Sequence, residues 1–103
     1  RYRLNQKGLE IVSVEPNPFI NEFTAIYTMG AEGEVKIIFY SQDGEVIHEE
    51  KVIAPAGQNE FSYDRGGALG KGAYVLSMTG EDRKLKVVTL LKEEMGGKGV
   101  VSK

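Results

Sequence analysis

The single histidine of the sequence lies beside the residues best suited to acid–base or metal chemistry. His48 is followed directly by Glu49 and Glu50, and imidazole with carboxylates is a common metal-ligand or general-base set. In an extended strand, however, consecutive side chains point to opposite faces, so the two carboxylates cannot both converge with the imidazole. Because a metal site needs three or four converging ligands, we expect no metal site, no cofactor and no catalytic residue.

Other residues that could bind a metal ion or a phosphate group are also better explained as turn residues. Asp43 and Asp64 stand at glycine-containing turns, and neither turn holds the several oxygen ligands that calcium needs in one loop. The glycine-rich segment 66–72 leads into a strand, so it lacks the helix N-terminus that phosphate binding uses. The chain has no cysteine, which removes thiol nucleophiles and disulfides. We therefore expect a non-enzymatic protein with no small-molecule substrate.

The composition is that of one soluble domain. The chain has 103 residues, of which 41% are hydrophobic and 27% charged, with a net charge of −2. A domain of this size buries roughly 60–70% of the surface of its unfolded chain, which suffices for one thin core but not for a deep cleft. The mixed charges lack the basic face of a nucleic-acid binder, so no nucleic-acid partner is expected. No apolar run is long enough to span a bilayer, and residues 1–7 lack the hydrophobic segment of a signal peptide.

Short segments rich in β-branched and aromatic residues alternate with glycine and proline turns. This rhythm is typical of a β-sandwich or barrel. The Asp43-Gly44 pair predicts a tight hairpin, and Pro16 and Pro18 end the first strand because proline lacks the amide donor that a strand ladder needs. The fold class is therefore predicted as all-β, an immunoglobulin-like antiparallel β-sandwich of about seven strands. The strands are expected at residues 9–14, 22–27, 34–40, 45–53, 58–63, 73–79 and 84–91.

The last strand carries a row of lysines. Lys84, Lys86 and Lys92 are expected on one side of this strand, with Val88 and Leu90 between them. One interpretation is a solvated face, or edge lysines that block unwanted strand pairing. The other is a surface that a partner protein reads. Open edge strands would also allow a weak homodimer by sheet extension.

Five short motifs follow one another in an order that resembles the C-terminal sorting domain of type IX secretion cargo, over residues 14–92. They are Pro16-Asn17-Pro18-Phe19, the strand 35–40 with Asp43-Gly44, Ala56-Gly57-Gln58-Asn59, Leu69-Gly70-Lys71-Gly72-Ala73-Tyr74, and the closing strand with its lysines. The resemblance implies an address that an outer-membrane translocon reads, with outer-membrane secretion machinery proteins as partners. It places the protein in the secreted fraction or on the bacterial outer-membrane surface, after passage through the periplasm. The candidate recognition residues are Pro16, Asn17, Pro18, Phe19, Gly44, Gly57, Asn59, Leu69, Gly72, Tyr74, Lys84, Lys86 and Lys92.

Several of these residues also have plain structural roles. We expect Asn17 to bond its own backbone, Phe19 to anchor the bend, Leu69 to plug the loop, and a buried Tyr74 to bond a nearby carbonyl. The sequence departs from the family at Ile20, where asparagine is usual. It also continues beyond the lysine strand. We therefore divide the chain into residues 1–13 (the end of a preceding linker and the first strand), 14–92 (the sorting domain) and 93–103 (a flexible tail).

A second family shares part of the pattern. The immunoglobulin-like repeat of flagellar-hook capping proteins also opens with a Pro-Asn-Pro-Phe-like turn and closes with Gly-x-Tyr, but its usual tryptophan is absent here. That alternative implies a structural or adhesive spacer in an extracellular multidomain protein. A carbohydrate-binding sandwich would need an exposed aromatic platform, for which Tyr27, Tyr40 and Tyr63 are the candidates.

Overall fold

The structure is a computed structural model that describes residues 8–93, and it is built almost entirely from strands. The elements are β1 (Glu10–Glu15), β2 (Phe23–Met29), β3 (Gly33–Ser41), β4 (Val46–Ala54), β5 (Gly57–Tyr63), the short 3₁₀ turn η2 (Gly66–Ala68), β6 (Gly72–Thr79) and β7 (Leu85–Lys92). Each strand lies within two residues of its predicted boundaries. No helix in this part of the chain is long and apolar enough to cross a membrane.

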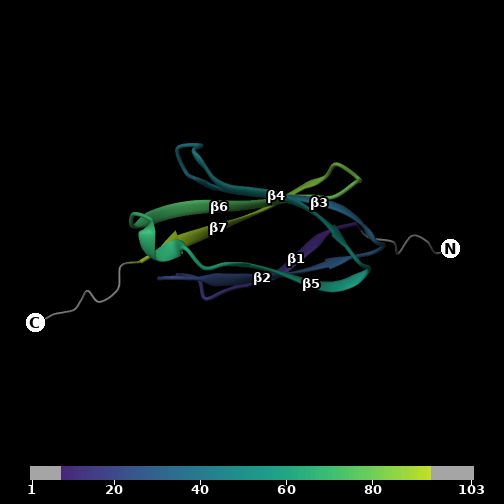
Figure 1. Cartoon of the computed structure of the whole chain (residues 1–103), viewed down its shortest axis with the longest axis horizontal. Coiled ribbons are helices and arrows are strands. Elements are labelled where there is room, and N and C mark those ends of the chain that lie inside the picture. Colours follow the sequence, from purple (N-terminus) through teal and green to yellow (C-terminus); the bar gives the residue numbers. More distant parts are fainter. Residues whose placement is uncertain (1–7, 94–103) are drawn as a thin grey trace, which may run out of the picture.

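The strands form two facing antiparallel sheets (Figure 1). One sheet has the order β1-β2-β5 and the other the order β4-β3-β6-β7. The predicted all-β antiparallel sandwich of seven strands is therefore confirmed. Each sheet has two edge strands, so within residues 8–93 β1, β5, β4 and β7 each have one side without a strand partner.

The core lies between the sheets and is rich in aromatic rings. The predicted alternation is confirmed on β2, where Phe23, Ala25 and Tyr27 are buried and the residues between them are half-buried. Phe39 of β3 is fully buried, with its ring centroid 5.2 Å from that of Phe23 and 5.0 Å from that of Tyr63. Tilted and edge-to-face aromatic pairs of this kind each add ~0.5–1.5 kcal/mol beyond the area they bury.

The β3–β4 hairpin has the turn chemistry that the sequence predicts. Gly44 has a φ of 94°, in the left-handed region that glycine tolerates best. The Ser41 hydroxyl accepts hydrogen bonds from the amides of Asp43 (3.3 Å) and Glu45 (3.1 Å). Gly44 is therefore required by the turn itself, whatever else it does.

Candidate recognition site

The proline-rich bend after β1 is tied to the last strand of the fold. The Asn17 side chain donates from Nδ2 to the Thr89 carbonyl (3.2 Å) and accepts at Oδ1 from the Leu91 amide (3.0 Å). The Phe19 amide then donates to the Leu91 carbonyl (2.9 Å), and the Glu93 amide donates to the Phe19 carbonyl (2.8 Å). The expectation that Asn17 bonds its own backbone is wrong. Its carboxamide instead offers one donor and one acceptor that match the free edge of β7.

Phe19 anchors the bend in the core, as predicted. It has no exposed surface, and its ring centroid lies 5.2 Å from that of Phe23 and 6.4 Å from that of Tyr74. The predicted role of Tyr74 is also confirmed, because its buried hydroxyl donates to the Gly70 carbonyl at 2.7 Å. Leu69 packs half-buried against the core. The opening bend and the Leu69–Tyr74 motif therefore meet through one aromatic contact.

The candidate recognition residues fall at two ends of the sandwich (Figure 1). The opening bend, the Leu69–Tyr74 motif, Lys92 and the Gly44 hairpin lie at the end where β7 finishes. The start of β5, which carries Gly57 and Asn59, lies at the other end (Figure 1). There the Asn59 side chain donates to the carbonyls of Pro55 (3.0 Å) and Gly57 (3.2 Å). Lys84 is also at that end, in the turn before β7. The structure thus gathers most of the motif residues but not all of them.

Lys86 and Lys92 lie on one side of β7, as expected, but they do not form the fully solvated face that was one of the two interpretations. Lys92 is only 4% exposed and donates to the Glu93 carbonyl at 2.8 Å. Lys86 is paired with Glu10 of β1 at 3.6 Å. Both lie on the side of β7 that also carries the buried Leu90, so they point toward the opposite sheet. Because both sides of β7 are largely apolar, its alternation could not tell which side faces water.

The exposed side of β7 carries large apolar residues instead. Leu85, Val87 and Leu91 are 62%, 53% and 47% exposed, and we call these three residues the apolar strip. In contrast, the outer face of the other sheet carries polar residues such as Thr24 and Ser62, whose hydroxyls are 2.9 Å apart. The alternation of residues 85–91 in the sequence indicates that the apolar strip lies on one side of the strand. It does not indicate that this side is the exposed one.

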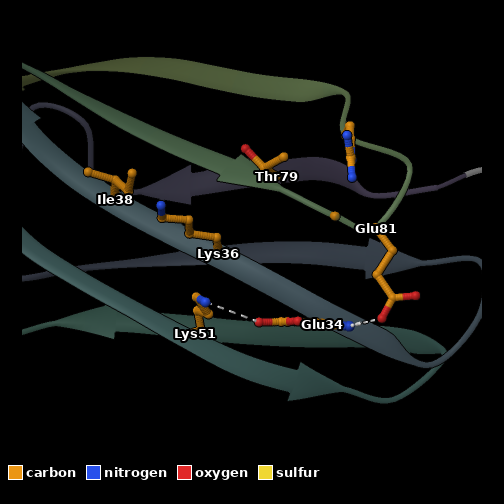
Figure 2. A pocket seen from close by; sticks show the side chains of 8 residues that line it. Glu34, Lys36, Ile38, Lys51, Thr79 and Glu81 are labelled. Carbon is orange, nitrogen blue, oxygen red and sulfur yellow. Dashed lines mark hydrogen bonds and ion pairs between the residues drawn. The ribbon is translucent and has the colours of Figure 1, made fainter.

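A shallow hollow lies on the outer face of the four-stranded sheet (Figure 2) and has a volume of about 600 Å³. Four of its charged side chains bond neighbouring groups. Lys51 pairs with Glu34 at 3.7 Å, the Glu34 amide donates to Glu81 Oε2 at 3.0 Å, and Lys36 pairs with Glu49 outside the hollow at 3.3 Å. Sequence analysis did not single out this hollow, because it is assembled from β3, β4 and the β6–β7 turn. It is lined by Glu34, Lys36, Ile38, Lys51, Thr79, Gly80, Glu81 and Arg83.

The histidine cluster has the geometry expected from an extended strand. His48 Nε2 lies 2.7 Å from Glu50 Oε1, and the His48 ring stacks on Phe61 with centroids 5.8 Å apart. Glu49 points to the other face, where it pairs with Lys36. Within residues 8–93 no three His, Cys, Asp or Glu side chains converge so as to hold a metal ion.

The three tyrosines considered as a sugar platform do not lie on one exposed face. Tyr27 and Tyr63 are 2% and 8% exposed and line the core, whereas Tyr40 is half-buried on the outer face of β3. Burial raises the pKa of Tyr27 above its ordinary value of 10.0, and the nearby Glu50 carboxylate raises it further. Burial likewise raises the pKa of Tyr63. These rings stabilise the core rather than offer a binding surface.

Comparisons with known proteins support the fold alone. The sequence matches no protein-family model, and no curated protein matches it. The fold is similar to part of a β-glucosidase from Listeria innocua solved in complex with glucose (TM-score 0.58, 12% identity, 82% of this chain). A mutant of a β-glucosidase from Listeria innocua, solved in complex with laminaribiose, matches at a TM-score of 0.53 and 11% identity, also over 82% of this chain. This chain spans only 15–16% of the length of those enzymes, so the domain described here resembles one small part of a larger protein.

Proposed function

We propose that this domain is a sorting domain that directs a larger cargo protein through a type IX outer-membrane translocon to the cell surface. The observation that carries the proposal is the attachment of Asn17 and Phe19 to Leu91. The first and last motifs of the family pattern, more than seventy residues apart, are thus held as one surface. When a recognition signal consists of segments that are far apart in the sequence, a contact between these segments allows one partner to bind them together.

The surface at this end has a shape that suits protein recognition. The side chains of Pro16, Pro18 and Ile20 are exposed beside Asn21 and Glu22 and form a shallow hollow together. Proline side chains lose little conformational entropy on binding. The buried Phe19 anchors the bend whose residues form the hollow. Ile20, where the sorting family usually has asparagine, contributes an apolar side chain to this hollow. A partner would therefore bind a rigid, partly apolar surface.

A surface-display experiment tests this function. The complete chain is fused to an exported reporter in a bacterium with a type IX system, and the surface fraction is measured by protease accessibility on intact cells. We expect surface display, and we expect Asn17→Ala to lower it because the bend is then less well held. Ser62→Ala is the matched control, since it removes one exposed hydroxyl contact on the polar outer face. A reporter that stays periplasmic, while an established sorting domain brings it to the surface, would refute the proposal.

A second candidate function is that of an immunoglobulin-like spacer in an extracellular multidomain protein. The observation in its favour is that the described chain begins with β1 at one end of the sandwich and finishes with β7 at the other (Figure 1). This arrangement suits a module placed in line between two neighbours. The same display experiment separates the candidates, because a spacer fused at the end of a reporter would not move it across the outer membrane.

A further inference from the structure

The β7 edge is covered along only half of its length. On the side away from β6, Thr89 and Leu91 bond Asn17 and Phe19. Backbone groups alternate between the two sides of a strand, so the amides and carbonyls of Leu85 and Val87 point to this same side. Within residues 8–93 no strand pairs with β7 there, and no backbone hydrogen bond is made by these two residues on that side. The open edge therefore runs from Leu85 to the amide of Thr89, because the Thr89 carbonyl already accepts a hydrogen bond from Asn17.

The other three edge strands carry features that discourage strand addition. A register irregularity between Ile11 and Ser13 bulges β1, and bulges twist an edge away from a new strand. β4 carries the charged run 49–51, and β5 carries polar residues including Gln58 and Glu60. In contrast, β7 is regular in its pairing with β6. Its open half presents the exposed Leu85 and Val87 side chains next to unpaired backbone groups.

We propose that this open edge pairs with the same edge of a second copy of the chain, antiparallel and with Val87 opposite Val87. Unpaired backbone donors and acceptors at strand spacing fit another extended backbone and little else. In this register the two Val87 residues exchange two hydrogen bonds. Leu85 lies opposite Thr89 of the second copy, where the Thr89 amide donates to the Leu85 carbonyl, because the Thr89 carbonyl is already bonded to Asn17. The exposed apolar side chains of the two copies then lie side by side on one continuous face.

Charge and steric limits select this register over its neighbours. Shifting the second strand by two residues in one direction places Lys86 directly opposite Lys86, which is unfavourable for like charges. Shifting it by two residues in the other direction places Leu85 opposite Leu91, whose edge is already occupied by Asn17 and Phe19. With Val87 at the centre, Lys86 lies opposite Val88, and no like charges meet within the open edge. The pairing is therefore self-complementary in only one register.

Cysteine cross-linking tests the pairing, because the natural chain contains no cysteine. Residues opposed in a hydrogen-bonded antiparallel pair have Cα atoms ~5.5 Å apart, within the ~4.4–6.8 Å range of disulfides. Full-length Val87→Cys should form disulfide dimers at least ~10-fold faster than Ile53→Cys, because pairing raises the effective concentration of the thiols. Ile53 is a matched control, since it is 66% exposed on the opposite edge strand of the same sheet. A mixture of Leu85→Cys and Thr89→Cys should likewise cross-link faster than either variant alone.

Sedimentation equilibrium provides the second measurement. The average mass of the natural chain should rise with concentration between roughly 10 μM and 1 mM, the range in which a weak association is detected. Val87→Lys should abolish the rise by opposing two like charges, whereas Ile53→Lys should leave it unchanged. Equal cross-linking rates for Val87→Cys and Ile53→Cys, together with a constant monomer mass, would overturn the proposal. A monomer whose Val87 amide is protected only on adding a synthetic strand of alternating valine and threonine would also overturn it, and would assign the edge to another protein.

Discussion

Replacing Asn17 by alanine isolates the attachment between the opening bend and β7. The variant loses one donated and one accepted hydrogen bond, at 3.2 and 3.0 Å. A hydrogen bond in a folded protein contributes ~0.5–1.5 kcal/mol net. Because water can replace Asn17 at this exposed edge, we expect Asn17→Ala to lower the free energy of unfolding by about 1–2 kcal/mol. For a domain of this size that corresponds to a fall in Tm of ~4–16 °C.

Urea unfolding and amide hydrogen exchange together measure the effect. Exchange at the Leu91 amide should accelerate in Asn17→Ala more than exchange in β2, because Leu91 loses its acceptor while the two Phe19 backbone bonds remain. Ser62→Ala, which removes one exposed hydroxyl contact, should change stability by less than ~0.5 kcal/mol. The reasoning would be refuted if Asn17→Ala unfolded at the same urea concentration as the natural chain with unchanged protection of Leu91.

Three further predictions concern the core. Phe19→Ala, which empties a fully buried site, should cost about 3–5 kcal/mol by urea unfolding, and Phe19→Leu clearly less. Gly66→Ala should destabilise by ~1–3 kcal/mol, because a Cβ at Gly66 would lie 2.7 Å from the Phe19 ring. Gly70→Ala, where a Cβ meets nothing within 4 Å, should be nearly neutral. The raised pKa of Tyr27 predicts stability that is complete below pH 10 and lost as pH rises through the folded-state pKa, since ionisation then favours the unfolded chain. Tyr27→Phe should reduce that alkaline loss in a pH series of unfolding curves, and an identical loss in both proteins would contradict the assignment.

The strands were predictable because their pattern is unambiguous where one face is buried. Phe23, Ala25 and Tyr27 alternate with residues that are partly polar. This alternation predicts both that the segment is a strand and which of its sides is buried. The Asp43-Gly44 turn and the buried Tyr74 follow from equally local chemistry. These features needed no knowledge of which strands are neighbours.

The rest depended on contacts between distant segments. The hydrogen bonds of Asn17 go to β7, more than seventy residues away, and no local rule selects that partner over its own backbone. The sequence also could not predict which side of β7 faces the core, since Val88 and Leu90 on one side are as apolar as Leu85 and Val87 on the other. Burial of Lys92 follows from that direction and from the Glu93 carbonyl beside it.

The attachment of Asn17 and Phe19 to β7 also bears on the order in which the polypeptide acquires its structure. Contacts of large sequence separation form slowly, because a long loop must close before they contribute. During synthesis the ribosome releases β1 and the bend first, long before β7 emerges to receive them. We therefore expect this seam to close late in folding, when β7 pairs with the bend.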